Sequence, residues 1–216
     1  MSEGLRERKK QRTRRHLSQV AMALFVERGF DAVTVAEVAA AAEVAVNTVY
    51  NYFPAKEDLV LPPQQASPGR LAAIVAARPP GVSAARAVLD HLRQEVRRRD
   101  RSLGLSEGFG PVFLMMRAAP TLTARLEDLG RQMNEELAAR LADEQPGDRP
   151  AARVVAWQLG AVHALVYTEI GARVAAGQPP AQIADAVLGL LDAAESALGQ
   201  PLLGYAVRKD EPSCSA

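Results

Sequence analysis

Apolar residues recur along this chain at the spacing of helices. In the first such segment, at about 7–28, they fall three and four residues apart and form one stripe: Leu17, Val20, Ala21, Leu24 and Phe25. This spacing places the apolar side chains on one face of an amphipathic helix. Clusters of proline and glycine interrupt the pattern, and the alternation typical of strands is almost absent. The pattern therefore predicts an all-α protein of about nine helices.

The same periodicity places the later helices between these breaks. Two short helices are expected at about 35–42 and 46–52, and another opens within "AKEDLVL" at 55–61. The remaining helices are expected at about 70–77, 83–101, 107–117, 121–143, 150–176 and 181–198. Proline or glycine follows most of these segments, as is typical where a helix ends.

The last two helices differ in how their apolar positions are distributed. The segment 181–198 carries one continuous stripe: Ile183, Val187, Leu190, Leu191, Ala194 and Leu198. The segment 150–176 is apolar on two sides, with Val155, Leu159, Val162 and Val166 on one and Val154, Ala161 and Leu165 on another. A helix that is apolar on two sides is expected to be buried on both, against its own core and against a second copy of the chain. The alternative is one large core without dimerisation.

The net charge of +1 for the 216 residues hides a strongly basic N-terminus. The basic residues there are Arg6, Arg8, Lys9, Lys10, Arg12, Arg14 and Arg15, opposed only by Glu3 and Glu7. A local basic segment on a nearly neutral chain favours a polyanionic partner. We expect residues 1–11 to form a flexible basic arm; the alternative is a disordered terminus that serves only solubility.

Residues 34–53 have the features of a helix-turn-helix. Thr34 is placed to cap the second helix, and Glu37, three residues later, completes a capping box. A three-residue turn separates it from the third helix, where Val49 and Phe53 lie four apart and point inward. Two short helices joined by a tight turn, the second with an exposed polar face, are typical of DNA-binding proteins.

The outer faces of the third helix supply the candidate DNA contacts. Asparagine can bond bidentately to adenine in the major groove, and a valine can touch a thymine methyl group. Hydroxyl groups of threonine and tyrosine suit phosphate oxygens, as does a lysine at the start of the next helix. The candidates are Thr34, Val46, Asn47, Thr48, Tyr50, Asn51, Tyr52 and Lys56. The alternative is an ordinary corner of a helical bundle with surface tyrosines.

Residues 12–59 resemble the DNA-binding domain of the TetR family of bacterial transcriptional regulators. The family pattern is a first helix ending in "F…GF" and then "TTV..IA..AGVS..TLY.YF..K..L"; this chain reads "LFVERGFDAVTVAEVAAAAEVAVNTVYNYFPAKEDL". The resemblance implies a three-helix DNA-binding domain at 12–60, and a helical domain at 61–204 that binds an effector and dimerises through two helices from each subunit. It also implies that the basic arm lies along DNA. The tail at 205–216 is expected to be loose.

Two residues in the turn depart from that pattern. Glu43 stands where the family has glycine, so a residue with a side chain has to adopt a left-handed conformation at a cost of about 1–2 kcal/mol. Ala45 stands where a serine usually caps the third helix, which forfeits about 0.5–2 kcal/mol. The turn is therefore expected to be strained but intact, because the inward positions match the pattern.

The effector site is expected where aromatic residues, methionines and buried polar tips occur together. The segment "EGFGPVFLMMRAAPTLTARL" combines such residues with glycines, and methionine suits adaptable apolar pockets. The candidates are Phe109, Phe113, Met116, Trp157, His163 and Tyr167, each of which is also plausible as ordinary core. Such a lining suits a mainly apolar ligand with a few hydrogen-bonding groups.

Together these features predict a homodimeric repressor that leaves a palindromic operator in double-stranded DNA when a small, mainly apolar effector binds. An activator, an effector-independent regulator and a purely helical interaction module remain alternatives, and an all-helical enzyme is less favoured. No catalytic, metal or cofactor site is expected, because no nucleophile motif or metal-ligand spacing occurs and the three histidines are far apart. The single cysteine, Cys214, and the lack of a long apolar segment fit a cytoplasmic protein outside the membrane.

Overall fold

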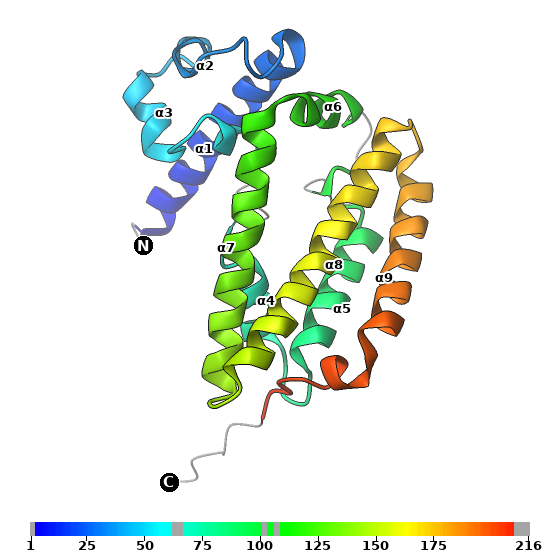
Figure 1. Cartoon of the computed structure of the whole chain (residues 1–216). Coiled ribbons are helices and arrows are strands. Elements are labelled where there is room, and N and C mark those ends of the chain that lie inside the picture. Colours follow the sequence, from blue (N-terminus) through cyan, green and yellow to red (C-terminus); the bar gives the residue numbers. More distant parts are fainter. Residues whose placement is uncertain (1–2, 62–66, 101–102, 106–108, 210–216) are drawn as a thin grey trace. The chain divides into compact units, whose positions relative to one another are not determined.

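The computed structural model describes residues 3–61, 67–100, 103–105 and 109–209. Within these ranges every regular element is helical, which confirms the all-α prediction. The helices are α1 (Glu3–Arg28), α2 (Val35–Ala41), α3 (Val46–Tyr52), α4 (Arg70–Ala77), α5 (Ala84–Arg97), α6 (Gly110–Ala118), α7 (Pro120–Glu144), α8 (Arg149–Ala175) and α9 (Pro180–Leu203), with a 3-10 helix, η1 (Glu57–Leu59), after α3 (Figure 1). The break expected near residue 199 lies within α9, at Gly199, whose φ is 70°.

Contacts divide the chain into two compact units. The first comprises Met1–Gln65 with Pro111–Leu126, and the second comprises Ala66–Gly110 with Glu127–Ala216. Most of α6 and the first turns of α7 thus group with the helix-turn-helix segment, although the sequence placed them in the second domain.

In the first unit, α1 packs against α2 and η1, and α2 packs against α3 (Figure 1). The apolar stripe of α1 is buried as expected at Leu17, Ala21 and Phe25. The aromatic rings of Phe25 and Phe30 meet with their centroids 5.0 Å apart, and Phe53 closes the same core. A small core of this kind holds the short helix α3, which has too few residues to be stable alone.

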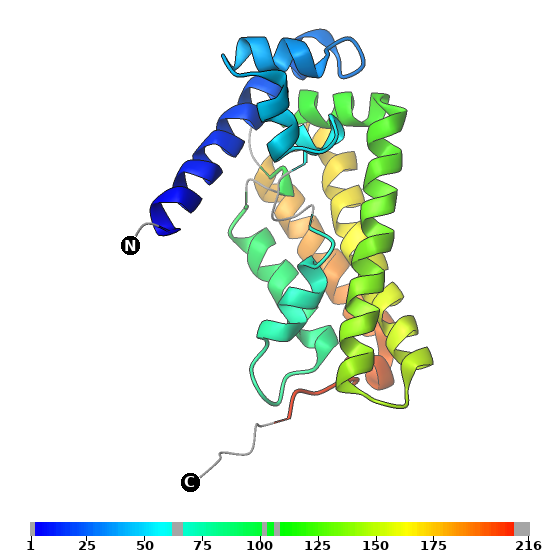
Figure 2. The same cartoon turned by 90° about the vertical axis from the view of Figure 1, so that its left-hand side faces the viewer.

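In the second unit, α5, α8 and α9 run alongside one another, and α4 packs on α5 (Figures 1 and 2). The two sides of α8 separate as the sequence predicts, because Val155, Leu159 and Val166 are buried whereas Val154 and Leu165 are exposed. On α9 the residues facing the core are Ile183, Val187 and Leu191. This division leaves one apolar side of α8 uncovered within a single chain.

Three expectations about local structure were wrong. Residues 3–11 are helical rather than a flexible arm, because Arg, Lys, Glu and Gln favour helix and Arg8 Nε donates to the Gly4 carbonyl at 2.9 Å. At 55–61 the expected α-helix does not form, and only the 3-10 helix η1 is present. Asp58 there accepts a hydrogen bond from the Ala55 amide at 3.1 Å. The prolines at 62–63 cannot continue a helix.

The tail also differs from expectation at its beginning. The backbone of Arg208 exchanges hydrogen bonds with Gly81 and Val82, at 2.9 and 3.0 Å. The guanidinium group of Arg78 donates to the Ala206 carbonyl at 2.8 Å. Residues 205–208 are therefore fastened to the loop before α5, and the remainder of the expected loose tail, from 210, lies outside the described residues.

Candidate functional site

Hydrogen bonds at the ends of α2 set the helix-turn-helix. At its start, the Glu37 amide donates to Thr34 Oγ1 at 3.2 Å, and the Thr34 amide donates to Glu37 Oε2 at 2.7 Å. This reciprocal pair is the capping box that the sequence predicts. Glu37 also forms an ion pair with Arg28 at 2.6 Å, which links the end of α1 to the start of α2.

The turn into α3 is a Schellman motif with a glutamate at its left-handed position. The amide of Glu43 donates to the Ala40 carbonyl at 3.1 Å, and that of Val44 donates to the Ala39 carbonyl at 3.0 Å. Glu43 has a φ of 54°, which confirms the expected left-handed conformation. Ala45, the N-cap of α3, makes no side-chain hydrogen bond because its methyl group cannot accept one. Glu43 therefore has the expected strained conformation, and Ala45 lacks the expected cap.

Helix α3 turns one face inward and leaves the others to solvent. Val49 is fully buried, and Phe53, which follows the helix, is 1% exposed. Val46 and Tyr50 are 40% and 48% exposed. Asn47 and Asn51 are also exposed, whereas Thr48 and Tyr52 are half-buried. Six of the eight candidate DNA contacts thus lie on one short helix, four of them exposed and two half-buried. Their contacts with DNA remain predictions.

Thr34 and Lys56, the other two candidates, already have partners within the fold. Thr34 is exposed, but its hydroxyl group donates to Glu37 Oε2 at 2.8 Å. The Lys56 ammonium group donates to the Phe30 carbonyl at 2.5 Å and lies 4.3 Å from the centre of the Phe30 ring. A phosphate contact by Lys56 would have to compete with these interactions, and the helix that starts there is only the three-residue 3-10 helix η1 rather than the expected α-helix.

Arg14 differs from the other basic residues of α1. Its guanidinium carbon lies 5.0 Å from the centre of the Phe53 ring, a cation–π contact. Its Nε atom is buried and has no hydrogen-bond partner among the described residues. The sequence pattern gave no reason to distinguish among the arginines of this segment. In the structure, Arg14 packs between α1 and the end of α3.

Three of the six effector candidates lie close together on α8. Trp157 and His163 line a crevice of about 200 Å³ between α7 and α8. One turn beyond His163, the Tyr167 ring lies 4.8 Å from the imidazole ring, centre to centre. His163 Nε2 and the Tyr167 hydroxyl group are buried without hydrogen-bond partners among the described residues. These three residues form the best-supported part of the candidate effector site.

The other three effector candidates lie on segments other than α8. Phe113 and Met116 lie half-buried on α6, which groups with the first unit. Phe109 is in the second unit, where its ring packs so closely on Gly104 that a Cβ there would lie 2.5 Å from the ring. Their role in effector binding stays a prediction.

Two charged residues near His163 and Tyr167 were missed. Arg70 at the start of α4 and Glu95 on α5 form an ion pair at 2.6 Å, with side chains only 7% and 13% exposed. His91, which the sequence offered only as a weak candidate, lies 3.3 Å from the other oxygen of Glu95. One signal in the sequence was available, because Arg70 is the only charged residue of an otherwise apolar helix, "RLAAIVAA".

The electrostatics of this group keep its two unpaired side chains uncharged near neutral pH. Burial lowers the pKa of His163 to about 4, and Arg70 lowers it further while Glu95 opposes. Burial raises the pKa of Tyr167 to about 12. For Glu95, burial opposes ionisation, but hydrogen bonds from His91 and Arg70 outweigh it and lower its pKa. The group therefore contains one compensated charge pair beside two neutral polar side chains.

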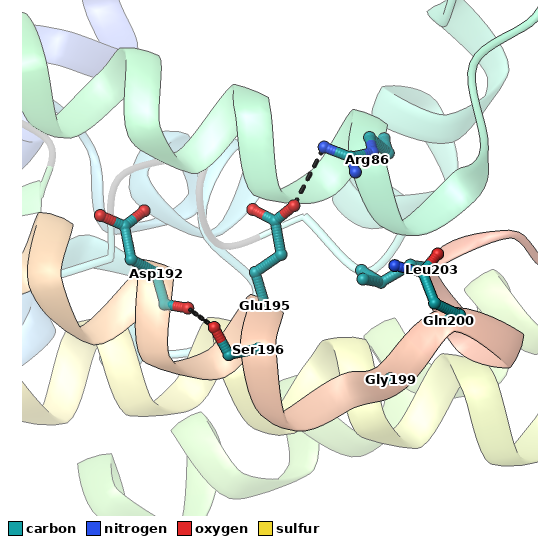
Figure 3. A pocket seen from close by; sticks show the side chains of 7 residues that line it. All are labelled: Arg86, Asp192, Glu195, Ser196, Gly199, Gln200 and Leu203. Atoms are coloured by element: carbon teal, nitrogen blue, oxygen red, sulfur yellow. Dashed lines mark hydrogen bonds and ion pairs between the residues drawn. The ribbon is translucent and has the colours of Figure 1, made fainter.

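A second and larger hollow lies on the surface between α5 and α9. It measures about 450 Å³ and is lined by Arg86, Asp192, Glu195, Ser196, Gly199, Gln200 and Leu203 (Figure 3). Its charged groups already have partners, because Arg86 pairs with Glu195 at 2.9 Å within the lining. Arg93, outside the lining, pairs with Asp192 and Glu195. It forms where α9 breaks at Gly199, and its open, internally paired lining makes it a poor site for an apolar effector.

The described residues contain neither a metal-binding cluster nor a membrane-spanning helix. No group of three histidine, cysteine, aspartate or glutamate side chains is placed to hold a metal ion. None of the helices in those ranges has the length and apolar character needed to cross a membrane.

Known proteins match the helix-turn-helix segment in sequence and the chain in fold. The model of the tetR family of bacterial regulatory proteins matches residues 17–61, which include α2, α3 and η1. The HTH-type transcriptional regulator TcmR of Streptomyces glaucescens is 34% identical over 140 residues, or 64% of this chain. The matched part spans 61% of TcmR, so the resemblance does not extend over that whole regulator.

A solved structure shows the same fold across most of the chain. NalD of Pseudomonas aeruginosa, described as the secondary repressor of the MexAB-OprM multidrug efflux pump, superposes with a TM-score of 0.52. The superposition covers 85% of this chain and 97% of NalD at 19% identity, which speaks for the fold alone. The helix-turn-helix segment, residues 17–61, thus matches the tetR family of bacterial regulatory proteins in sequence, and its geometry agrees with that match.

Proposed function

We propose that this protein is a transcriptional repressor that binds a palindromic operator and leaves it when a small effector binds. The observation that carries the proposal is the outward face of α3, where Val46, Asn47, Tyr50 and Asn51 are exposed on a helix fixed from within by Val49. Asparagine amides can read adenine edges in the major groove, and the tyrosine hydroxyl suits a phosphate. The family match over these residues supports the same role.

A homodimer would present two such helices to one duplex. The support is the uncovered side of α8, where the large apolar side chains of Val154 and Leu165 stay 56% and 50% exposed. Exposed apolar patches of this kind commonly mark protein–protein interfaces. Two copies related by a two-fold axis would place two α3 helices on half-sites separated by whole turns of DNA, which explains why the operator should be palindromic.

Release by an effector requires that the ligand prefer one arrangement of the dimer. A ligand with equal affinity for the DNA-bound and free arrangements would shift nothing, whatever its affinity. The crevice beside Trp157 and His163 is the candidate site for such a ligand. By linkage, the effector must weaken operator binding by the same factor by which the operator weakens effector binding.

Selection of bound sequences from a random duplex pool tests the DNA-binding part of the proposal. We expect the purified protein to enrich a palindrome whose half-sites are about ten base pairs, or a multiple of that, apart. No enrichment at low salt would contradict DNA binding and favour a helical interaction module. A reporter placed behind the selected sequence then tests the sign of regulation, because loss of the gene should raise expression for a repressor and lower it for an activator.

A further inference from the structure

The second unit contains polar groups that its own fold does not satisfy. His163 Nε2, the Tyr167 hydroxyl group and Arg70 Nε are all buried, and none has a hydrogen-bond partner among the described residues. Buried polar atoms in native proteins are nearly always hydrogen-bonded, to protein or to something bound. Three such atoms in one region therefore indicate that a further hydrogen-bonding molecule belongs there.

These three atoms are electrostatically coupled. The His163 and Tyr167 rings are 4.8 Å apart, and Arg70 and Glu95 act on the ionisation of both side chains. Arg70 is already paired with Glu95 through Nη2 at 2.6 Å, so its charge is compensated while its Nε–H remains to be donated. The region therefore offers a donor from Arg70, a hydroxyl group and a neutral imidazole, without a free positive charge.

The crevice between α7 and α8 reaches His163 from the surface, and the Tyr167 ring lies against the His163 ring. Its lining extends from exposed Trp157, Ala161 and Ala164 to His163, and it is mainly apolar. Gly130 leaves open space where a Cβ would stand, whereas at Gly160 the Asn134 side chain occupies that position. The crevice thus suits a compact apolar body with a polar group at its inner end.

We propose that the effector is an uncharged, mainly apolar molecule with a carbonyl or hydroxyl oxygen, which His163, Tyr167 and Arg70 bind at the inner end of the α7–α8 crevice. The oxygen has to accept, because an arginine N–H can only donate. A carboxylate would add a second buried negative charge beside Glu95, and burying an uncompensated charge is strongly unfavourable. This inference rests on the proposed function only in calling the ligand an effector; binding itself needs no operator.

Trp157, the only tryptophan in the chain, allows a direct test. Its fluorescence would be titrated with 2-decalone, a bicyclic ketone, and with decalin-2-carboxylate, which has the same skeleton but an ionised group. The variants are Tyr167→Phe and Arg70→Met, with Tyr205→Phe and Arg86→Met as matched controls. Tyr205 donates to the Asp148 carbonyl, and the Arg86 side chain is 52% exposed, so neither control touches the crevice.

We expect saturable quenching by 2-decalone, at least tenfold weaker for the carboxylate. Tyr167→Phe should weaken ketone binding about five- to tenfold, which is the effect of removing one hydrogen bond to a buried group. Arg70→Met should do the same, and neither control should change it. If circular dichroism shows that Arg70→Met does not fold, the ketone affinity of Tyr167→Phe alone tests the proposal.

Three results would overturn the proposal: no saturable response to 2-decalone, equal binding of the carboxylate, or unchanged binding by Tyr167→Phe. Any of them would mean that ordered water satisfies these polar atoms. Operator binding measured without probe keeps the two claims separate, because a protein that binds its operator but not the ketone loses only this inference.

Discussion

At Glu43 a single residue sets the shape of the turn between the two helices of the DNA-binding motif. A Schellman motif needs a left-handed residue at this position, and glycine adopts that conformation without steric cost. Glu43 adopts it with a φ of 54°, and the next helix starts at Ala45 without a side-chain cap. Two unfavourable residues thus lie side by side in a turn whose hydrogen bonds are complete.

Relief of this strain is expected to stabilise the protein. Glu43→Gly should raise the free energy of unfolding by about 1 kcal/mol, and Ala45→Ser by a similar amount through a new cap. Each corresponds to roughly 2–4 °C in Tm for a chain of this size. Differential scanning calorimetry would measure the shift. Glu43→Ala is the control, because it removes the charge but keeps the Cβ; an equal rise in that variant would show that charge, not conformation, is responsible.

Glu37 makes the same motif sensitive to acid. Hydrogen bonds from the Thr34 backbone first, then from Arg28, lower the pKa of Glu37 from 4.5 to about 2. Because the folded pKa lies below the unfolded value, the stabilisation is fully present above about pH 4.5 and is lost as the pH falls toward 2.

The prediction concerns the difference between the wild-type protein and Glu37→Gln. Urea unfolding should show the wild-type protein more stable near neutral pH, with the difference in unfolding free energy shrinking as the pH is lowered from about 5 to 3. A difference that stays constant over this range would mean that the carboxylate charge of Glu37 does not stabilise the motif.

Among the elements, α1 combines two roles on one helix. Its inner face packs the core through Leu17, Ala21 and Phe25, while most of its basic residues are exposed. Arg14 belongs with the inner face, because its guanidinium group stacks on Phe53. Basic residues that look alike in the sequence therefore divide into one that supports the position of α3 and others that are free to meet phosphate groups.

Arg14→Met and Arg12→Met should separate these roles. Arg14→Met removes a cation–π contact worth about 0.5–2 kcal/mol and should lower Tm. Arg12→Met, at an exposed position, should leave Tm unchanged but reduce the salt dependence of DNA binding by about one released counterion. Calorimetry and fluorescence anisotropy at several salt concentrations would measure the two effects. Equal Tm values for both variants would remove Arg14 from the structural role.

Helix positions could be predicted well because they depend on local signals. Proline and glycine end most helices near the expected places, although α9 continues past Gly199 to Leu203 and no α-helix forms at 55–61. The Thr34–Glu37 capping box lies within four residues. The partners of Lys56, Arg14 and Arg70 could not be predicted, because each is set by tertiary packing that brings distant residues together. Long, flexible cations are especially hard to place, since the same side chain can pack on a ring or reach solvent.

At the scale of the whole molecule, the exposed apolar side chains on one side of α8 have no packing partner within one chain. Leu165→Glu places a charge in the proposed interface between copies, so it should convert a dimer to a monomer and abolish tight operator binding. Sedimentation equilibrium and anisotropy would measure both. Ala139→Glu, at an exposed position on α7, is the control. A Leu165→Glu protein that stays dimeric would place the interface elsewhere.

The most direct test of the account compares wild-type protein and Asn47→Ala on the selected palindrome and on random duplex, by fluorescence anisotropy at fixed salt. We expect Asn47→Ala to weaken binding to the palindrome by about 1–3 kcal/mol per half-site and to leave binding to random duplex nearly unchanged. Such a result would show that the outward face of α3 reads bases. Equal losses on both duplexes, or none on either, would contradict that claim.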